Sequence, residues 1–206
     1  MSHAPLTLLL GWSAVAIGVV GTRSQFRRIS TRGVAGVSIA TWTLFVLMGC
    51  FWMSYGFVAH SWQVSMGSAL AAPWQLAILV RLKVWEHASI VARSVAAFLA
   101  CCVVPTVLFG WAGGVLGTGV AMTINRAPQL IELIRQVDAS GVSAGSWYLG
   151  VLGCSLWIIY YTGVHLWAAL AATSAAGVAN LAIALLTSGR HVQARRRLVA
   201  EQVFAS

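Results

Sequence analysis

The 206-residue sequence has few charged residues and very few acidic ones. Asp, Glu, Lys and Arg make up 8% of the chain, and only four residues are acidic. Soluble domains average roughly 25% charged residues, so this scarcity argues against a water-soluble fold. No basic segment precedes the first apolar run, so we expect no cleavable signal peptide.

The sequence also has few cysteines and no recognisable catalytic cluster. The four cysteines fall within apolar runs, and none has metal-ligand spacing with a histidine. We therefore expect no disulfide framework, no metal and no cofactor, and we interpret these residues as small apolar fillers. Because no nucleophile lies in a pattern with a base, we do not expect an enzyme.

Long apolar runs dominate what is present, since 59% of the residues are hydrophobic. A helix of about 20 residues crosses a bilayer, and the runs do not alternate as the strands of a membrane barrel do. The sequence therefore predicts an all-α membrane protein with seven transmembrane helices. The predicted spans are 6–22, 37–59, 64–80, 91–109, 111–126, 143–163 and 167–187.

The basic residues give this bundle an orientation. The net charge is +9, and in a seven-span arrangement all 13 basic residues fall on one side of the membrane. Positive charge stays cytoplasmic, so we expect an outer N-terminus, a basic cytoplasmic tail at 189–206 and no nucleic-acid partner. A bacterial inner membrane is the expected location, and the tail could also contact anionic lipid.

The chain repeats itself at an offset of 105 positions. Between residues 36 and 62, eleven positions are identical to the position 105 residues later, among them Trp52 and Trp157. With one residue of slack, Ser24 and Gln25 align with Pro128 and Gln129. The repeats predict two parallel three-helix units, 6–80 and 111–187, joined by an inverting helix at 91–109. Such units typically enclose a substrate site near the middle of the membrane.

The segment "APQLIELIRQVDASGVSAGSW" resembles a PQ-loop, and "FWMSYG" and "LWIIYYTG" resemble the segment that follows it in the SWEET (MtN3/saliva) and PQ-loop transporters. The resemblance covers about residues 8–187. It implies a facilitative sugar carrier that works by alternating access. Only the second repeat has the proline of the motif.

The resemblance also implies the residues of the site. A tryptophan on the second helix and polar residues on the third would line the pocket, although the polar residues differ here from the usual asparagines. The implied substrate-binding residues are Trp52, Trp157, Ser68, Thr173, Gln75 and Asn180, and the implied hinge residues are Ser24, Gln25, Pro128 and Gln129. Tryptophans at span ends can instead be interfacial anchors, and hydroxyls within spans can simply join helices.

Three functions remain open at this point. No charged residue is expected at membrane depth, which favours uncoupled passage of a small neutral solute, a sugar first. A proton-coupled carrier of amino acids or another small metabolite is the alternative, with Glu132 and Asp138 as the candidate acids. A membrane receptor or scaffold that uses the basic turns is the third. A homo-oligomer is possible under each of them, but none requires it.

Overall fold

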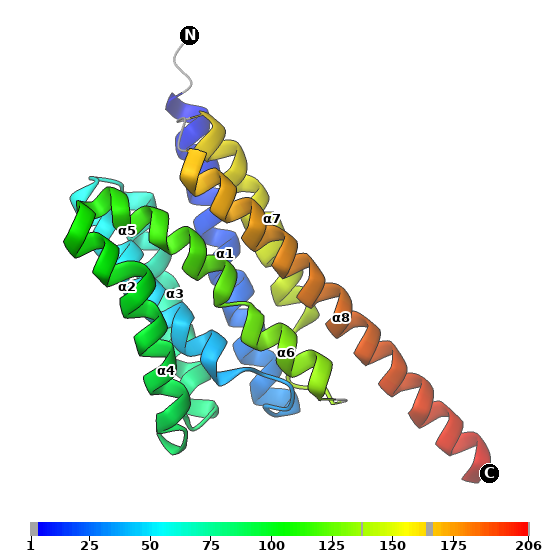
Figure 1. Cartoon of the computed structure of the whole chain (residues 1–206). Coiled ribbons are helices and arrows are strands. Elements are labelled where there is room, and N and C mark those ends of the chain that lie inside the picture. Colours follow the sequence, from blue (N-terminus) through cyan, green and yellow to red (C-terminus); the bar gives the residue numbers. More distant parts are fainter. Residues whose placement is uncertain (1–3, 137, 164–166, 206) are drawn as a thin grey trace.

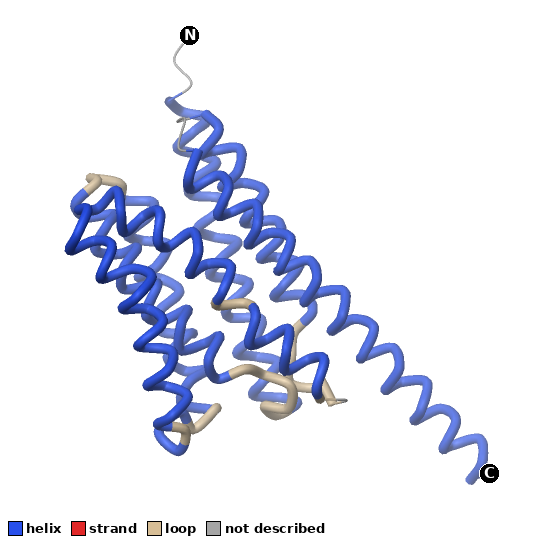
Figure 2. The backbone as a smooth tube through the Cα atoms, viewed as in Figure 1, coloured by secondary structure: helices blue, strands red, loops and turns tan. Residues whose placement is uncertain are grey.

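The computed structural model describes residues 4–136, 138–163 and 167–205, and within these ranges it consists of helices and loops with no strand (Figure 2). Most of the helices are long, and short loops connect them. The helices are α1 (Ala4–Arg32), α2 (Ile39–Val58), α3 (Trp62–Arg81), the 3-10 turn Val84–Glu86, α4 (Ala88–Phe98), the π-helical turn Leu99–Val103, α5 (Val104–Ile124), α6 (Ala127–Arg135), α7 (Ala144–Gly163) and α8 (Trp167–Ala205).

Among the residues that the structure describes, three helical segments are long and apolar enough to cross a membrane: α2, α3 and the continuous segment Ala88–Arg135. The all-α prediction and the presence of membrane-length helices are thereby confirmed. The third segment turns back at Gly110, whose φ of 70° and ψ of −168° are not helical. A Cβ on Gly113 would lie 2.5 Å from the Pro105 carbonyl oxygen, so the two arms of this turn are in close contact. Gly110 is also the residue between the predicted spans 91–109 and 111–126.

Two helices continue well past their predicted spans. α1 ends at Arg32, not near residue 22, and α8 continues through the expected tail to Ala205. The final turns of α8 extend beyond the bundle (Figure 1). A hydropathy pattern marks only the apolar part of a helix, whereas arginine and lysine are good helix formers in water. The predicted tail is therefore helical in the described residues.

The helices pack in the same order in the two parts of the chain. α3 contacts both α1 and α2, and α8 contacts both α5 and α7 (Figure 1). We call α1, α2 and α3 the N-terminal bundle, and α5, α6, α7 and α8 the C-terminal bundle. The two bundles meet mainly where α1 packs on α7. The two helices are in contact at Gly21, where an added Cβ would lie 3.4 Å from the Leu149 Cβ, which is an ordinary van der Waals distance.

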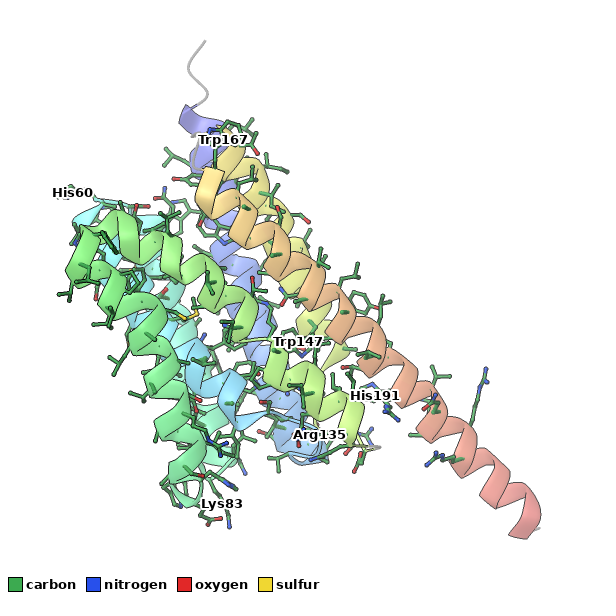
Figure 3. The ribbon with its side chains drawn as sticks, in the orientation of Figure 1. His60, Lys83, Arg135, Trp147, Trp167 and His191 are labelled. Atoms are coloured by element: carbon green, nitrogen blue, oxygen red, sulfur yellow. The ribbon has the colours of Figure 1, made fainter. Side chains whose placement is uncertain are left out.

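The two ends of the molecule differ in charge. Lys83, Arg135 and His191 lie toward one end, while His60 and Trp167 lie toward the other (Figure 3). We call the first the basic end and the second the opposite end. The larger hydrophobic core includes Trp42, Leu82 and Leu133 and therefore lies near the basic end.

Candidate functional site

Two glycine-containing loops contact each other at the basic end. The loop before α2 contains Gly36, and the loop before α7 contains Gly141, which is its equivalent at the 105-residue offset. A Cβ on Gly36 would lie 2.9 Å from the Asp138 carbonyl oxygen, and one on Gly141 would lie 2.4 Å from the Gly33 carbonyl oxygen. The Gly141 N–H donates to the Ala35 carbonyl at 3.1 Å. These loops can approach so closely because neither glycine has a side chain.

Two buried glutamines join the bundles across these loops. Gln25 on α1 donates from Nε2 to the Gly141 carbonyl at 2.9 Å, and its Oε1 accepts from the Ser143 N–H at 2.8 Å. Gln129 on α6 donates to the Gly36 carbonyl at 2.6 Å and accepts from the Ser38 N–H at 2.9 Å. Each side chain is 1% exposed. Gln25 belongs to the N-terminal bundle and bonds the loop before α7, whereas Gln129 belongs to the C-terminal bundle and bonds the loop before α2. The two side chains thus make equivalent pairs of bonds, and we call them the glutamine latches.

The remaining predicted hinge residues lie beside these latches. Ser24 Oγ is 3.2 Å from Ser143 Oγ, and Ser143 also accepts from the Ser146 N–H at the start of α7. Ser38 has the matching role before α2, where it accepts from the Thr41 N–H. Pro128 lies in the first turn of α6, a position that needs no N–H donor. The four predicted hinge residues therefore lie together at the basic end.

Aromatic rings form the next layer toward the centre. Phe45 lies between the equivalent Trp42 and Trp147, with ring centroids 5.3 Å and 6.3 Å away respectively. Both tryptophans are buried. All three side chains line the space between the bundles.

All six predicted substrate-binding residues line the space between the bundles. One cavity of about 240 Å³ is lined by Gln75, Trp157, Thr173 and Asn180 together with Trp42 and Trp147. A second, of about 190 Å³, is lined by Trp52, Ser68, Trp157 and Thr173. Because Trp157 and Thr173 line both, the cavities adjoin, and we call them together the central cavity. Its walls come from both bundles.

The cavity wall combines aromatic faces with polar groups that have few partners. Trp157 stacks on Tyr161 at a centroid distance of 5.5 Å, and Trp52 meets Tyr55 edge to face at 5.7 Å. The Gln75 Oε1 is buried without a hydrogen-bond partner, while Asn180 donates weakly to the Cys154 sulfur at 3.5 Å. Aromatic faces with a few fixed polar groups are typical of pockets for small ligands.

One charged residue contradicts the prediction of an uncharged cavity. Arg126, which the positive-inside pattern assigns to the cytoplasmic basic residues, lines the central cavity and is 5% exposed. Its Nε donates to Asn180 Oδ1 at 2.5 Å, and its guanidinium lies over the Phe45 ring at 5.6 Å. Nη1 donates to Asn125 Oδ1 at 2.8 Å and to the Met122 carbonyl, near the end of α5. These partners allow the cation to be buried beside an apolar wall.

The two candidate acids, Glu132 and Asp138, do not line this cavity. Glu132 accepts from Gln136 and lines a separate groove with Arg93 and Arg135, and Asp138 is exposed. His60 is exposed at the opposite end, and its repeat equivalent His165 lies outside the described residues. In the described ranges, no group of three His, Cys, Asp or Glu side chains could hold a metal ion.

The comparisons with known proteins add no relative. No protein-family model, no curated protein and no solved structure matches the chain. The resemblance to SWEET and PQ-loop transporters therefore stays a prediction from the motifs and the repeat.

Proposed function

We propose that the chain is a facilitative membrane carrier that moves a small polar solute by alternating access between its two bundles. In this proposal, seven spans form two parallel three-helix units joined by the inverting segment that ends at Gly110. The common packing order of the two bundles supports parallel units, because α3 and α8 occupy equivalent positions. The basic end would face the cytoplasm, with the N-terminus outside.

The central cavity is the observation that carries this proposal. It lies between the bundles, and its lining includes all three predicted pairs of repeat equivalents, Trp52 with Trp157, Ser68 with Thr173 and Gln75 with Asn180. A site at the interface of two structural repeats is the arrangement that rocking-bundle transport requires. Tryptophan faces can stack on an apolar surface of the solute while the polar groups fix its orientation.

The glutamine latches supply the closed gate that such a carrier needs. They join the bundles at the basic end through four hydrogen bonds to buried backbone groups. In the proposed cycle these bonds break when the bundles separate toward the cytoplasm and form again when they close. Each bond joins neutral groups, so opening requires no proton.

A counterflow assay in proteoliposomes tests the proposal. Glucose is the first solute to test, because the resemblance implies a sugar, followed by small organic anions and amino acids. We expect the double variant Trp52→Ala, Trp157→Ala to lose counterflow of whichever solute is carried, while Trp85→Ala, which changes an exposed residue, retains it. Full flux in the double variant would show that Trp52 and Trp157 do not form the solute-binding site. A lack of exchange of every solute by the unaltered protein would instead favour a receptor or scaffold.

Proton-coupled transport is the second candidate. It requires an acidic or other titratable relay group along the path. Glu132 and Asp138 are the acids nearest to the latches in sequence, and neither lines the central cavity. This placement favours the uncoupled carrier.

A further inference from the structure

Arg126 is a buried cation without a carboxylate partner. Among the described residues, Lys83 and Glu86 form the single ion pair, at 3.2 Å. The two acids nearest to Arg126 in sequence have other partners, since Glu132 accepts from Gln136 and Asp138 accepts from the Ser140 N–H. A buried charge without a counter-charge is costly, and charged groups within membrane spans commonly mark a substrate path.

The hydrogen bonds of Arg126 leave one side of its guanidinium free. The N–H of Nε and the two of Nη1 have acceptors in Asn180, Asn125 and the Met122 carbonyl. A guanidinium has five N–H groups, and the two on Nη2 have no partner among the described residues. The acceptors that are present are all neutral. The fork of a guanidinium matches the two oxygens of a carboxylate, so the free side suits an acidic ligand.

Two further polar atoms on the same cavity are unpaired. Trp42 Nε1 and Gln75 Oε1 are buried without a hydrogen bond, and both residues line the cavity with Arg126. Unsatisfied buried polar atoms are rare in folded proteins, because each costs free energy. The first is a donor and the second an acceptor, and each side chain must turn toward the cavity to contact a ligand, because both atoms are buried. The rest of the wall is mainly aromatic or apolar.

We propose that the central cavity binds a small organic monocarboxylate, with Arg126 as the receptor for its carboxylate. This inference rests on the proposed carrier function and names its substrate class. Arg126 is the only cation that lines the described cavity, so it can balance one negative charge on a ligand but not a second. No acidic residue lines the described wall either, so the ammonium group of an amino acid would find no counter-charge. A neutral sugar would leave the guanidinium unbalanced.

A purely structural role for Arg126 makes a different prediction. The Met122 carbonyl is among the last four of α5, which lack helical partners, and a basic side chain often binds such groups. If capping were the whole role, the protein would bind an anion no better than its neutral analogue. The two roles are therefore separated by pairs of similar ligands, of which one carries a carboxylate and the other is neutral.

The test is isothermal titration of the purified protein with three ligand pairs: lactate and lactamide, benzoate and benzamide, and glucuronate and glucose. We expect at least one carboxylate to bind about tenfold or more tightly than its neutral partner, as a charge-assisted hydrogen bond implies. Arg126→Gln should remove this preference, and Arg126→Lys should retain part of it. Equal binding within every pair, or no binding of any carboxylate, would overturn the proposal.

A second variant keeps the test valid if Arg126→Gln does not fold. Gln75→Glu removes no hydrogen bond of Arg126 and adds a carboxylate to the same cavity wall, where its negative charge would oppose that of an anionic ligand. We expect it to keep the thermal stability of the unaltered protein and to lose the preference for carboxylates. An unchanged preference would contradict the proposal. Should glucose instead exchange in proteoliposomes while no carboxylate binds, the carrier would stand and this inference would fail.

Discussion

The glutamine latches allow a quantitative test of the gate. Replacing Gln25 by leucine removes a donor and an acceptor from the Gly141 carbonyl and the Ser143 N–H, both of which are buried. Leaving one buried polar group unpaired costs about 1–3 kcal/mol, so the loss of both partners should destabilise the closed state by about 2–6 kcal/mol. Since about 1.4 kcal/mol is a tenfold change in an equilibrium constant, the equilibrium constant for opening at the basic end should increase by about 30- to 20,000-fold. Gln129→Leu should act to the same extent, because its bonds are equivalent.

Cys154 provides the assay, because its side chain lines the central cavity. In a protein with Cys50, Cys101 and Cys102 replaced by alanine, a membrane-impermeant maleimide is applied to inside-out vesicles. It reaches Cys154 only when the basic end opens. The rate of Cys154 labelling should rise in Gln25→Leu and Gln129→Leu, by up to the same factor as the equilibrium constant for opening. Gln193→Leu, which alters an exposed glutamine on α8, should label at the rate of the parent.

One result would refute this reasoning. If the latch variants lose thermal stability but label Cys154 at the parent rate, the four bonds persist in every conformation. They would then hold the fold together without forming a gate. Unequal effects of Gln25→Leu and Gln129→Leu would show that the bundles do not open symmetrically.

Two further predictions concern the loops and the acids. Gly141→Ala should destabilise the closed basic end and speed Cys154 labelling, because the new Cβ would lie 2.4 Å from the Gly33 carbonyl oxygen. Gly145→Ala is the matched control, since the nearest atom to a Cβ there lies at 3.9 Å. Equal labelling rates in the two variants would contradict a close contact at Gly141. Glu132→Gln and Asp138→Asn should leave solute flux and its pH dependence unchanged, because neither acid lines the central cavity; loss of pH-driven accumulation in either variant would favour the coupled carrier.

The repeat was the most informative part of the sequence. α7 (Ala144–Gly163) begins and ends 105 residues after α2 (Ile39–Val58), as the aligned identities predict. The same offset related the pairs of residues that line the central cavity. Because similar sequence segments form similar helices, the repeat predicts that α2 and α7 are equivalent. The repeat does not predict which faces of the two bundles contact each other.

The repeat could not show that Arg126 lines the central cavity. We assigned it to the basic turns because positive residues at span ends are usually cytoplasmic. The signal that could have distinguished it is its position inside the predicted span 111–126, where Asn125 precedes it. With the same one residue of slack that aligns Gln25 with Gln129, the first repeat has Gly21 and Thr22 there, so the alignment gives no second arginine to compare. The burial of Arg126 depends on acceptors from α5 and α8, which only the folded structure brings together.

The latches show a similar limit. Gln25 and Gln129 were predicted as hinge residues from the motif, but their partners are backbone groups of the opposite bundle. No spacing within the sequence indicates that exchange. It depends on the close approach of the loops at Gly36 and Gly141, which is a property of the interface.

Parallel bundles are the central claim, and cysteine accessibility tests it most directly. In a protein with its four native cysteines replaced by alanine, single cysteines are introduced as Val34→Cys, Arg135→Cys and Ala59→Cys, all at exposed positions. With an impermeant maleimide, we predict that Val34→Cys and Arg135→Cys react only from the cytoplasmic face, and that Ala59→Cys reacts only from outside. Reaction of Val34→Cys and Arg135→Cys from opposite faces would contradict the account.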